Sequence, residues 1–218
     1  MKTATLLNVV LALALVIVCV RWATSRASNT TANQTGVDTA QVVYNNIMTR
    51  TSIREYLDKP VEDEKIDKLL HAAMAAPTAV NLQPWHFVVI KDKNTLGSIA
   101  EITPNARMAK GAPLAIVVCG DMTNETNDMI RKFWSQDASA ATENILLQAH
   151  AMGLGAVWTG TYPDEKRCAS VSKLLNLPDN LIPFCTIVIG YPTGPATPKD
   201  KWKTENVTYE EFKKCTVE

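Results

Sequence analysis

The chain has 218 residues, of which 46% are hydrophobic and 20% charged, so it can bury one core but is too short for a multidomain machine. Lys and Arg together number 22, as do Asp and Glu, and a formal net charge of zero gives nothing that would hold nucleic acid. The five cysteines form no C-x-x-C pair and there are only three histidines, so neither a metal site nor a disulfide scaffold is expected.

The amino terminus carries an apolar run from Ala4 to Val20, which is typical of an export signal. The run is long for a cleaved signal and at the lower limit for a membrane span, so residues 1–27 are interpreted as either a signal peptide or a membrane anchor. Both interpretations place the protein outside the cytosol, periplasmic or membrane-anchored. Residues 28–39 are rich in Ser, Thr, Asn and Gln and predict a flexible linker, so one folded domain is expected over residues 40–218.

The first half of the domain alternates helices and strands. A helix is expected to start near Thr39, and apolar residues at three- and four-residue steps predict an amphipathic helix over 62–75. Strands are predicted over 85–91 and 114–120, which are short, β-branched and almost wholly apolar, as strands buried on both faces are. The Ala- and Leu-rich stretch over 137–152 predicts a long central helix.

The second half continues with a strand over 156–159, a helix over 164–175 and a buried strand over 183–191. A Pro- and Lys-rich tail follows, and the segment from Thr208 to Glu211 resembles a capping box that opens a last short helix. The elements follow no strict βαβ rhythm, so periodicity alone supports an α/β or α+β sandwich.

A first candidate site is the cluster Arg50, Thr51, Ser52 and Arg54, with two guanidiniums and two hydroxyls within five residues. The cluster suits a phosphate, because arginine presents a planar fork of donors that matches phosphate oxygens and hydroxyls add donors without charge. The alternative is a solvated turn or a helix cap made by Ser52, and on these residues alone that alternative is the more frequent case.

A second candidate is the polar, proline-bounded loop before the strand at 85–91. Asn81 and Gln83 each carry an amide that both donates and accepts hydrogen bonds, as reading the edge of a heterocycle requires. A loop that is held by its own amides explains these residues equally well.

Two further patterns are weaker by themselves. The glycines at Gly153 and Gly155 follow a helix and open a strand, so they do not form a dinucleotide-binding fingerprint, which must follow a strand and open a helix. Gly160, at the end of that strand, allows a backbone to approach a ligand closely. Lys199 and Lys201 are, on their own, most often part of a solvated charge run.

Taken together, four ordered segments resemble the FMN-dependent nitroreductase family: RTSIR, AAPTAVNLQPW, NILLQAHAMGLGAVWTG, and IGYP followed by KDKW. The resemblance covers residues 44–212. It implies an α+β fold, a three-layer α/β/α sandwich with a central mixed sheet. It further implies a homodimer with an exchanged C-terminal tail, in which each FMN site is built from both subunits.

The resemblance also assigns roles in binding the cofactor. The flavin phosphate, the ribityl chain and part of the ring would be held by Arg50, Ser52 and Arg54. Thr51 would contribute contacts from its backbone.

The remaining roles fall on three other segments. Thr78 and Asn81 would come from the partner subunit. Lys199 and Lys201 would close on the phosphate, although many relatives have Arg at the second position, and a lysine is a point charge rather than a fork, so weaker phosphate affinity is expected. Three residues would run along the flavin with a backbone N–H facing its reactive nitrogen: Trp158, Thr159 and Gly160.

The implied activity is transfer of electrons from NADH or NADPH through bound FMN to a nitroaromatic, a quinone or a related small acceptor by a ping-pong mechanism. Because the flavin performs the chemistry, no catalytic side chain and no metal are expected. The acceptor is expected to be chosen by residues between about Pro104 and Ser135, the most variable part of the family.

Two alternatives stay open. A membrane-anchored reductive dehalogenase would share this fold and an amino-terminal hydrophobic segment. A non-enzymatic flavin electron-relay protein at a membrane is the other, because NAD(P)H is scarce outside the cytosol.

Overall fold

The computed structural model describes residues 38–123 and 127–210. The predicted signal peptide or membrane anchor lies wholly outside the described residues, as does nearly all of the predicted linker, and both stay predictions. The chain divides into two units, Met1–Tyr44 and Asn45–Glu218, and the packing below is that of the second unit. In the part of the chain that the structure describes, no helix has the length and apolar character that a membrane span needs.

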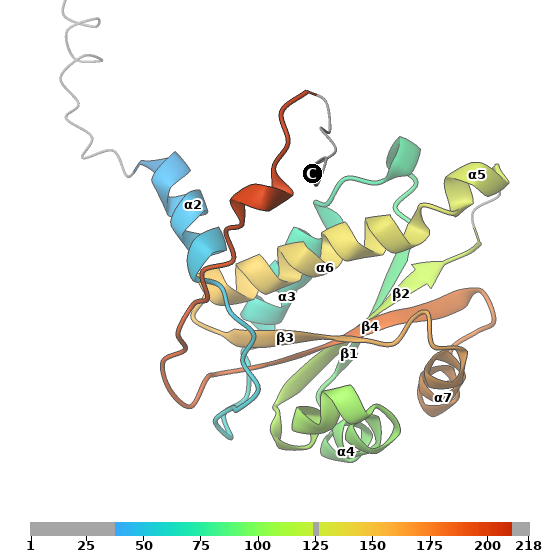
Figure 1. Ribbon diagram of the computed structural model, residues 1–218. Coiled ribbons are helices and arrows are strands. Elements are labelled where there is room, and N and C mark those ends of the chain that lie inside the picture. Colours follow the sequence, from blue (N-terminus) through green and yellow to red (C-terminus); the bar gives the residue numbers. More distant parts are fainter. Residues whose placement is uncertain (1–37, 124–126, 211–218) are drawn as a thin grey trace, which may run out of the picture. The chain divides into compact units, whose positions relative to one another are not determined.

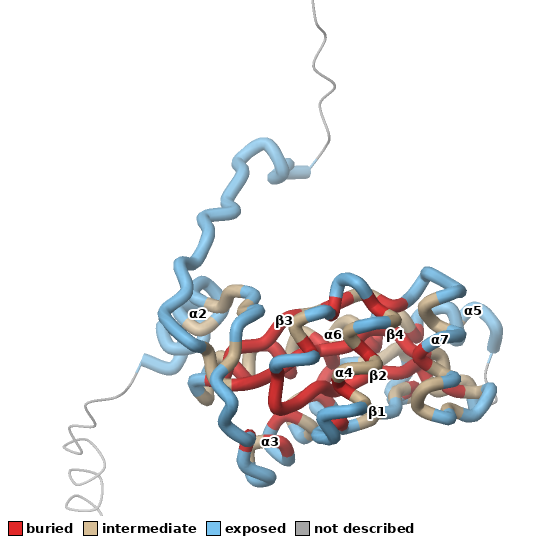
Figure 2. Tube along the Cα trace, turned by 90° about the horizontal axis from the view of Figure 1, so that it is seen from below, coloured by how far each residue is buried: buried red, intermediate tan, exposed pale blue. Residues whose placement is uncertain are grey.

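Four strands form one sheet in the order β1-β2-β4-β3: β1 Trp85–Ile90, β2 Leu114–Asp121, β3 Gly155–Gly160 and β4 Leu181–Gly190. The central strands β2 and β4 are buried along almost their whole length, as predicted (Figure 2). Strand β1 was expected to be buried on both faces, but only Ile90 is fully buried, because β1 is an edge strand with a neighbour on one side only.

Helices cover both faces of this sheet (Figure 1). Helices α3 Asp63–Met74 and α6 Trp134–Ala151 pack together on one face, and α4 Lys93–Ile102 and α7 Glu165–Leu175 on the other. Each face has its own hydrophobic core. The predicted three-layer α/β/α arrangement is confirmed, and so is its α+β class.

The sheet is less mixed than the resemblance implies. All three pairs of neighbouring strands are antiparallel. Parallel pairing occurs in an isolated bridge between Ser52 and Ala156, at the outer edge of β3. The mixed character of the described sheet therefore rests on that bridge.

Three elements between the strands were not predicted. They are α4, the 3₁₀ helix η2 Pro104–Gly111 and the short helix α5 Asp128–Arg131. Helix α4 is capped at its N-terminus by Asp92, whose side chain accepts a hydrogen bond of 2.8 Å from the Thr95 backbone N–H. A helix was expected to open at Thr208. The residues from Thr208 to Glu210 are not helical, and the described residues end at Glu210.

Helix α2 Thr39–Thr49 begins where it was predicted. It leads into an extended segment, Arg50–Tyr56, that follows the outer edge of β3: the Ile53 backbone N–H donates to the carbonyl oxygen of Ala156 at 3.1 Å. After β4 and Tyr191, the chain continues as a tail whose residues 193–210 are all exposed.

Candidate functional site

The outer edge of β3 presents backbone groups that β4 does not use. Antiparallel pairing alternates along a strand, and the carbonyl of Ala156 faces Ile53 rather than β4. Trp158 and Gly160, two and four residues further on, therefore also direct their backbone N–H and C=O groups to this edge. The resemblance to the nitroreductase family implies a backbone N–H on this strand that faces the flavin, and the outward N–H groups of β3 are available for that contact.

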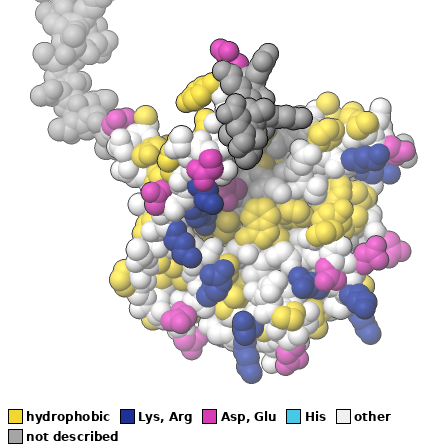
Figure 3. Space-filling view, viewed as in Figure 1, with side chains coloured by type: hydrophobic (Ala, Val, Ile, Leu, Met, Phe, Trp, Pro, Cys, Tyr) yellow, Lys and Arg dark blue, Asp and Glu magenta, His cyan; other side chains and the backbone are white. Residues whose placement is uncertain are grey.

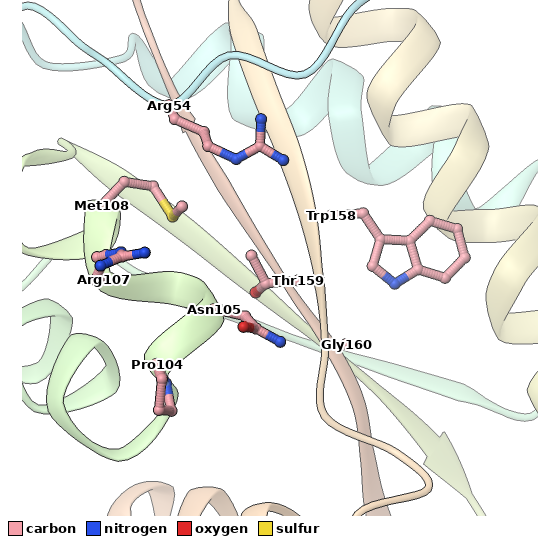
Figure 4. Close-up of a pocket in the computed structure, with 8 residues that line it drawn as sticks. All are labelled: Arg54, Pro104, Asn105, Arg107, Met108, Trp158, Thr159 and Gly160. Carbon is pink, nitrogen blue, oxygen red and sulfur yellow. The ribbon is translucent and has the colours of Figure 1, made fainter. Parts of the chain in front are cut away.

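A pocket of about 340 Å³ lies along this edge (Figure 4). Its lining comes from the extended segment, from η2 and from β3: Arg54, Pro104, Asn105, Arg107, Met108, Trp158, Thr159 and Gly160. Figure 4 shows the Arg54 guanidinium extending toward β3 and the Asn105 amide pointing toward Gly160. Four of the predicted site residues thus come together: Arg54, Trp158, Thr159 and Gly160.

Gly160 lies beside open space. A Cβ atom at this position would meet, among the described residues, only the carbonyl oxygen of Tyr162, at 4.0 Å. Glycine weakens a strand interior, and packing within the described chain does not demand it here. At Gly155, by contrast, a Cβ would lie 2.6 Å from Ile53, so that glycine is required by packing. The free space at Gly160 fits a flat ligand against the strand.

The segment that carries Arg54 is fixed by Tyr56. The Tyr56 hydroxyl lies 2.6 Å from the carbonyl oxygen of Ile53 and 3.0 Å from that of Val188 on β4. Burial raises the pKa of the Tyr56 hydroxyl far above its ordinary value, and the nearby Arg54 charge opposes that shift only in part. Tyr56 therefore stays protonated and can hold this segment against the sheet.

The first residues of the RTSIR cluster do not enter the pocket with Arg54. Arg50 is largely buried against α6, where its Nε lies 3.4 Å from Oε1 of Glu143. Thr51 lines a second pocket that also includes His150. Ser52 forms the bridge to β3. An extended chain advances about 3.3 Å per residue, so Arg50 and Arg54 lie at most about 13 Å apart along the segment.

Thr78 and Asn81 are not brought to the pocket of this chain. Their loop, Thr78–Gln83, precedes β1, which is the opposite edge of the sheet from β3. Lys199 and Lys201 do not line this pocket either, and both lie in the exposed tail.

The loop Thr78–Gln83 has an unusual backbone. Val80, Asn81 and Gln83 have φ of 46°, 57° and 53°, a region in which a β-branched valine is strained. Within the loop, the Gln83 N–H donates to Oγ1 of Thr78 at 3.1 Å.

A buried carboxylate on α6 holds this loop from outside. Oδ1 of Asp137 accepts a hydrogen bond of 3.0 Å from the Ala79 backbone N–H. Sequence reasoning missed Asp137, although a signal was present: it lies one turn before Ala141 and two before Ile145, on the apolar stripe of the predicted helix. A carboxylate on such a stripe needs a partner inside the protein.

His150, near the end of α6, gives a pH-dependent contribution to stability. Its Nε2 lies 2.8 Å from Oγ1 of Thr49, and burial, followed by the charge of Arg50, lowers its pKa. The unfolded chain therefore binds the extra proton more readily than the folded one. The contribution is complete above the unfolded value of about 6.5 and is lost as the pH falls through the folded value.

We expect the midpoint temperature of thermal unfolding to decrease as the pH is lowered from about 7.5 to about 5.5. The decrease should be smaller in His150→Gln, because glutamine does not titrate in this range. Thermal melts of both proteins across that range measure the difference. Superimposable pH profiles would show that His150 does not carry this dependence.

Comparison with known proteins places the chain among flavoenzyme relatives. The model of the nitroreductase family matches residues 47–106 and 100–191. A Methanothermobacter thermautotrophicus protein provisionally named NADH dehydrogenase/NAD(P)H nitroreductase is 45% identical over 166 residues, which are 76% of this chain and 85% of the relative.

Solved structures agree. A crystal structure of a protein with the same provisional name from Parabacteroides distasonis has a TM-score of 0.74 and 44% identity, covering 78% of this chain and 99% of that one. An FMN-dependent nitroreductase from Clostridium difficile has a TM-score of 0.71 and 32% identity, with coverage of 78% and 99%.

Proposed function

This chain belongs to the nitroreductase family, and on that premise we propose that it is an FMN-dependent oxidoreductase that takes electrons from NADH or NADPH and gives them to a nitroaromatic, a quinone or a related small acceptor. The observation that carries the proposal is the β3 pocket, where an outward strand edge and the space beside Gly160 adjoin Arg54. The Clostridium difficile relative, named an FMN-dependent nitroreductase, supports the choice of cofactor.

The described residues fit FMN at the ring end of the site. Arg54 would face the ring edge that carries negative charge after reduction, and the Gly160 N–H would donate to the ring from the strand. Along the extended segment, Ser52 would follow the ribityl chain and Arg50 would face the phosphate. Arg50 would then exchange its ion pair with Glu143 for a contact with phosphate, or share its donors between the two.

When bound, FMN supplies the redox chemistry, and the chain binds, orients and stabilises. NAD(P)H and the acceptor would use the open side of the pocket in turn, which is a ping-pong mechanism. Pro104, Asn105, Arg107 and Met108 line that pocket, so the start of the segment expected to choose the acceptor lies where an acceptor would bind.

We propose further that the protein is a homodimer with shared sites. Thr78 and Asn81 lie at the β1 edge, remote from Arg54 in this chain, as expected if they serve the site of a partner. The exposed tail carries Lys199 and Lys201, and its Trp202 has 72% of its surface exposed, which suits a segment that packs on a second copy.

The test is the visible absorption spectrum of the purified protein, before and after NADH is added under nitrogen. Flavin bands that bleach with NADH are expected. Bands that bleach only with a redox protein would favour the electron-relay alternative, and turnover of iodotyrosine-like substrates without quinone reduction would favour the dehalogenase. A protein that takes up no flavin even when FMN is added would contradict the proposal.

A further inference from the structure

The arginines of the described residues divide into two groups. Three of the five make ion pairs with carboxylates: Arg50 with Glu143, Arg131 with Asp128 and Arg167 with Asp164. The other two, Arg54 and Arg107, line the β3 pocket, and no Asp or Glu is among the described residues that line it. Among the described residues, the pocket therefore holds two guanidiniums and no carboxylate in its lining.

Figure 3 shows a band of hydrophobic side chains on this face of the molecule, with Lys and Arg side chains beside it and Asp and Glu side chains interspersed among them. An apolar surface next to positive charge suits a flat organic anion rather than a free inorganic ion.

Arg107 is held on a fixed platform. It lies on η2 between Ala106 and Ala109, both of which are fully buried in the core beneath the sheet. Figure 4 shows Arg107 and Met108 on the opposite side of the pocket from Trp158. Because the buried alanines fix the backbone on both sides of it, the exposed Arg107 side chain projects from a fixed point at the rim of the pocket.

The two guanidiniums have different tasks if the proposed function holds. Arg54 lies on the segment that the resemblance assigns to the flavin. Arg107 comes from η2, which lies outside the segments that carry that resemblance, and so remains available for the second ligand of the pocket.

We propose that Arg107 is a specificity-determining residue that favours acceptors with an anionic group, a carboxylate or a sulfonate, on their aromatic ring. This inference rests on the proposed function. The guanidinium binds the anionic group through charge-assisted hydrogen bonds, while Pro104 and Met108 give the reducible ring an apolar contact. The Asn105 amide offers a further donor on the same side of the pocket.

The test isolates the acceptor step. Protein that retains FMN is reduced with dithionite, freed of excess reductant and mixed with para-nitrobenzoate or with its neutral analogue para-nitrobenzamide, and the return of flavin absorbance is followed. No nucleotide is present, so the phosphates of NAD(P)H do not compete for Arg107.

The wild type is expected to be reoxidised faster by the anion. In Arg107→Gln, the second-order rate with para-nitrobenzoate should fall about 10-fold, the value of one charge-assisted hydrogen bond, and the rate with the amide should change less than about 2-fold. Arg107→Lys should fall between the two. Lys110→Gln, which removes an exposed charge from the same helix outside the pocket lining, should change neither rate.

The other outcomes distinguish this inference from the function beneath it. Equal losses with both acceptors would assign Arg107 to the flavin or to the fold, and unchanged rates would make it a solvated side chain; each overturns the inference and leaves the oxidoreductase intact. A change in reduction by NADPH but not by NADH, with both acceptor rates unchanged, would assign Arg107 to the donor and also overturn it. Reduced protein that neither acceptor reoxidises would remove the proposed function itself.

Discussion

Replacing Gly160 with valine is expected to abolish tight FMN binding while the fold is preserved. Among the described residues, the Cβ would meet only the carbonyl oxygen of Tyr162, at 4.0 Å, so a Cβ atom fits at this position without a clash. Valine also suits a strand better than glycine does. The new methyl groups would occupy the space beside the outward-facing backbone, which is where the flavin ring is proposed to lie.

The affinity for FMN should fall about 100-fold, because a rigid ring that lies against a strand cannot move aside for a branched side chain. Overpacking of this kind costs about 1–3 kcal/mol. Fluorescence titration with FMN measures the affinity, and the far-UV circular dichroism spectrum and melting temperature report the fold. Gly160→Ala should give a smaller loss of the same kind.

Two other glycines serve as controls with opposite expectations. Gly97→Ala, in α4, meets nothing within 4 Å, so it should keep FMN and raise stability by about 1 kcal/mol. Gly155→Ala would place its Cβ 2.6 Å from Ile53 and should lower the melting temperature. A Gly160→Val protein that binds FMN as the wild type does would exclude a flavin on this edge.

The elements that could be predicted from the sequence are those with strong local patterns. Strands β2 and β4 are continuous apolar runs, and α6 is long and rich in alanine, so their predicted and observed bounds agree within a few residues. Helix α4 was missed because Asn94, Thr95, Gly97 and Ser98 are poor helix formers, and its stability comes from the buried Leu96 and Ile99.

The residues of the candidate site also differ in whether the local sequence indicates them. Arg54 and Gly160 belong to segments with recognisable local sequence, and the structure brings both to one pocket. Arg107 lies in the long segment that was expected to choose the acceptor, but nothing in the local sequence singles it out, since only the packing of η2 against β3 brings it to the site. The partner of Arg50, Glu143, is 93 positions away in the chain, and a contact of that kind cannot be read from composition or spacing.

Asp137→Ala is expected to lower both the stability of the protein and its affinity for FMN. The substitution removes the acceptor for the Ala79 N–H and so releases a loop in which Val80 and Asn81 have positive φ. The lost hydrogen bond and the unsatisfied group should cost about 1–3 kcal/mol of the free energy of unfolding. Asn81, which is proposed to serve the FMN site of a partner subunit, would lose its fixed position.

Asp137→Asn is the matched control, because an amide oxygen can still accept from the Ala79 N–H. It should keep most of the FMN affinity that the alanine variant loses. Urea denaturation gives the stability, and flavin fluorescence gives the affinity. If the alanine variant binds FMN like the wild type despite a lower stability, Asp137 acts on the fold alone.

The same variant tests whether a site is built from two chains. When Gly160→Val and Asp137→Ala chains are produced together with different affinity tags, purification on both tags yields the heterodimer. In a shared arrangement, one of its sites receives both lesions, and the other combines the intact β3 edge of one chain with the intact loop of the other. The heterodimer should therefore bind FMN at one site with wild-type affinity, although neither parent does.

A site formed within a single chain gives the opposite result, because each chain then carries one lesion and the heterodimer binds no better than its parents. Failure to recover any heterodimer by the double purification would contradict the homodimer itself. The positions make the test sharp, since Gly160 and the loop held by Asp137 lie at opposite edges of one sheet. Only a second copy can bring an intact loop to an intact β3 edge.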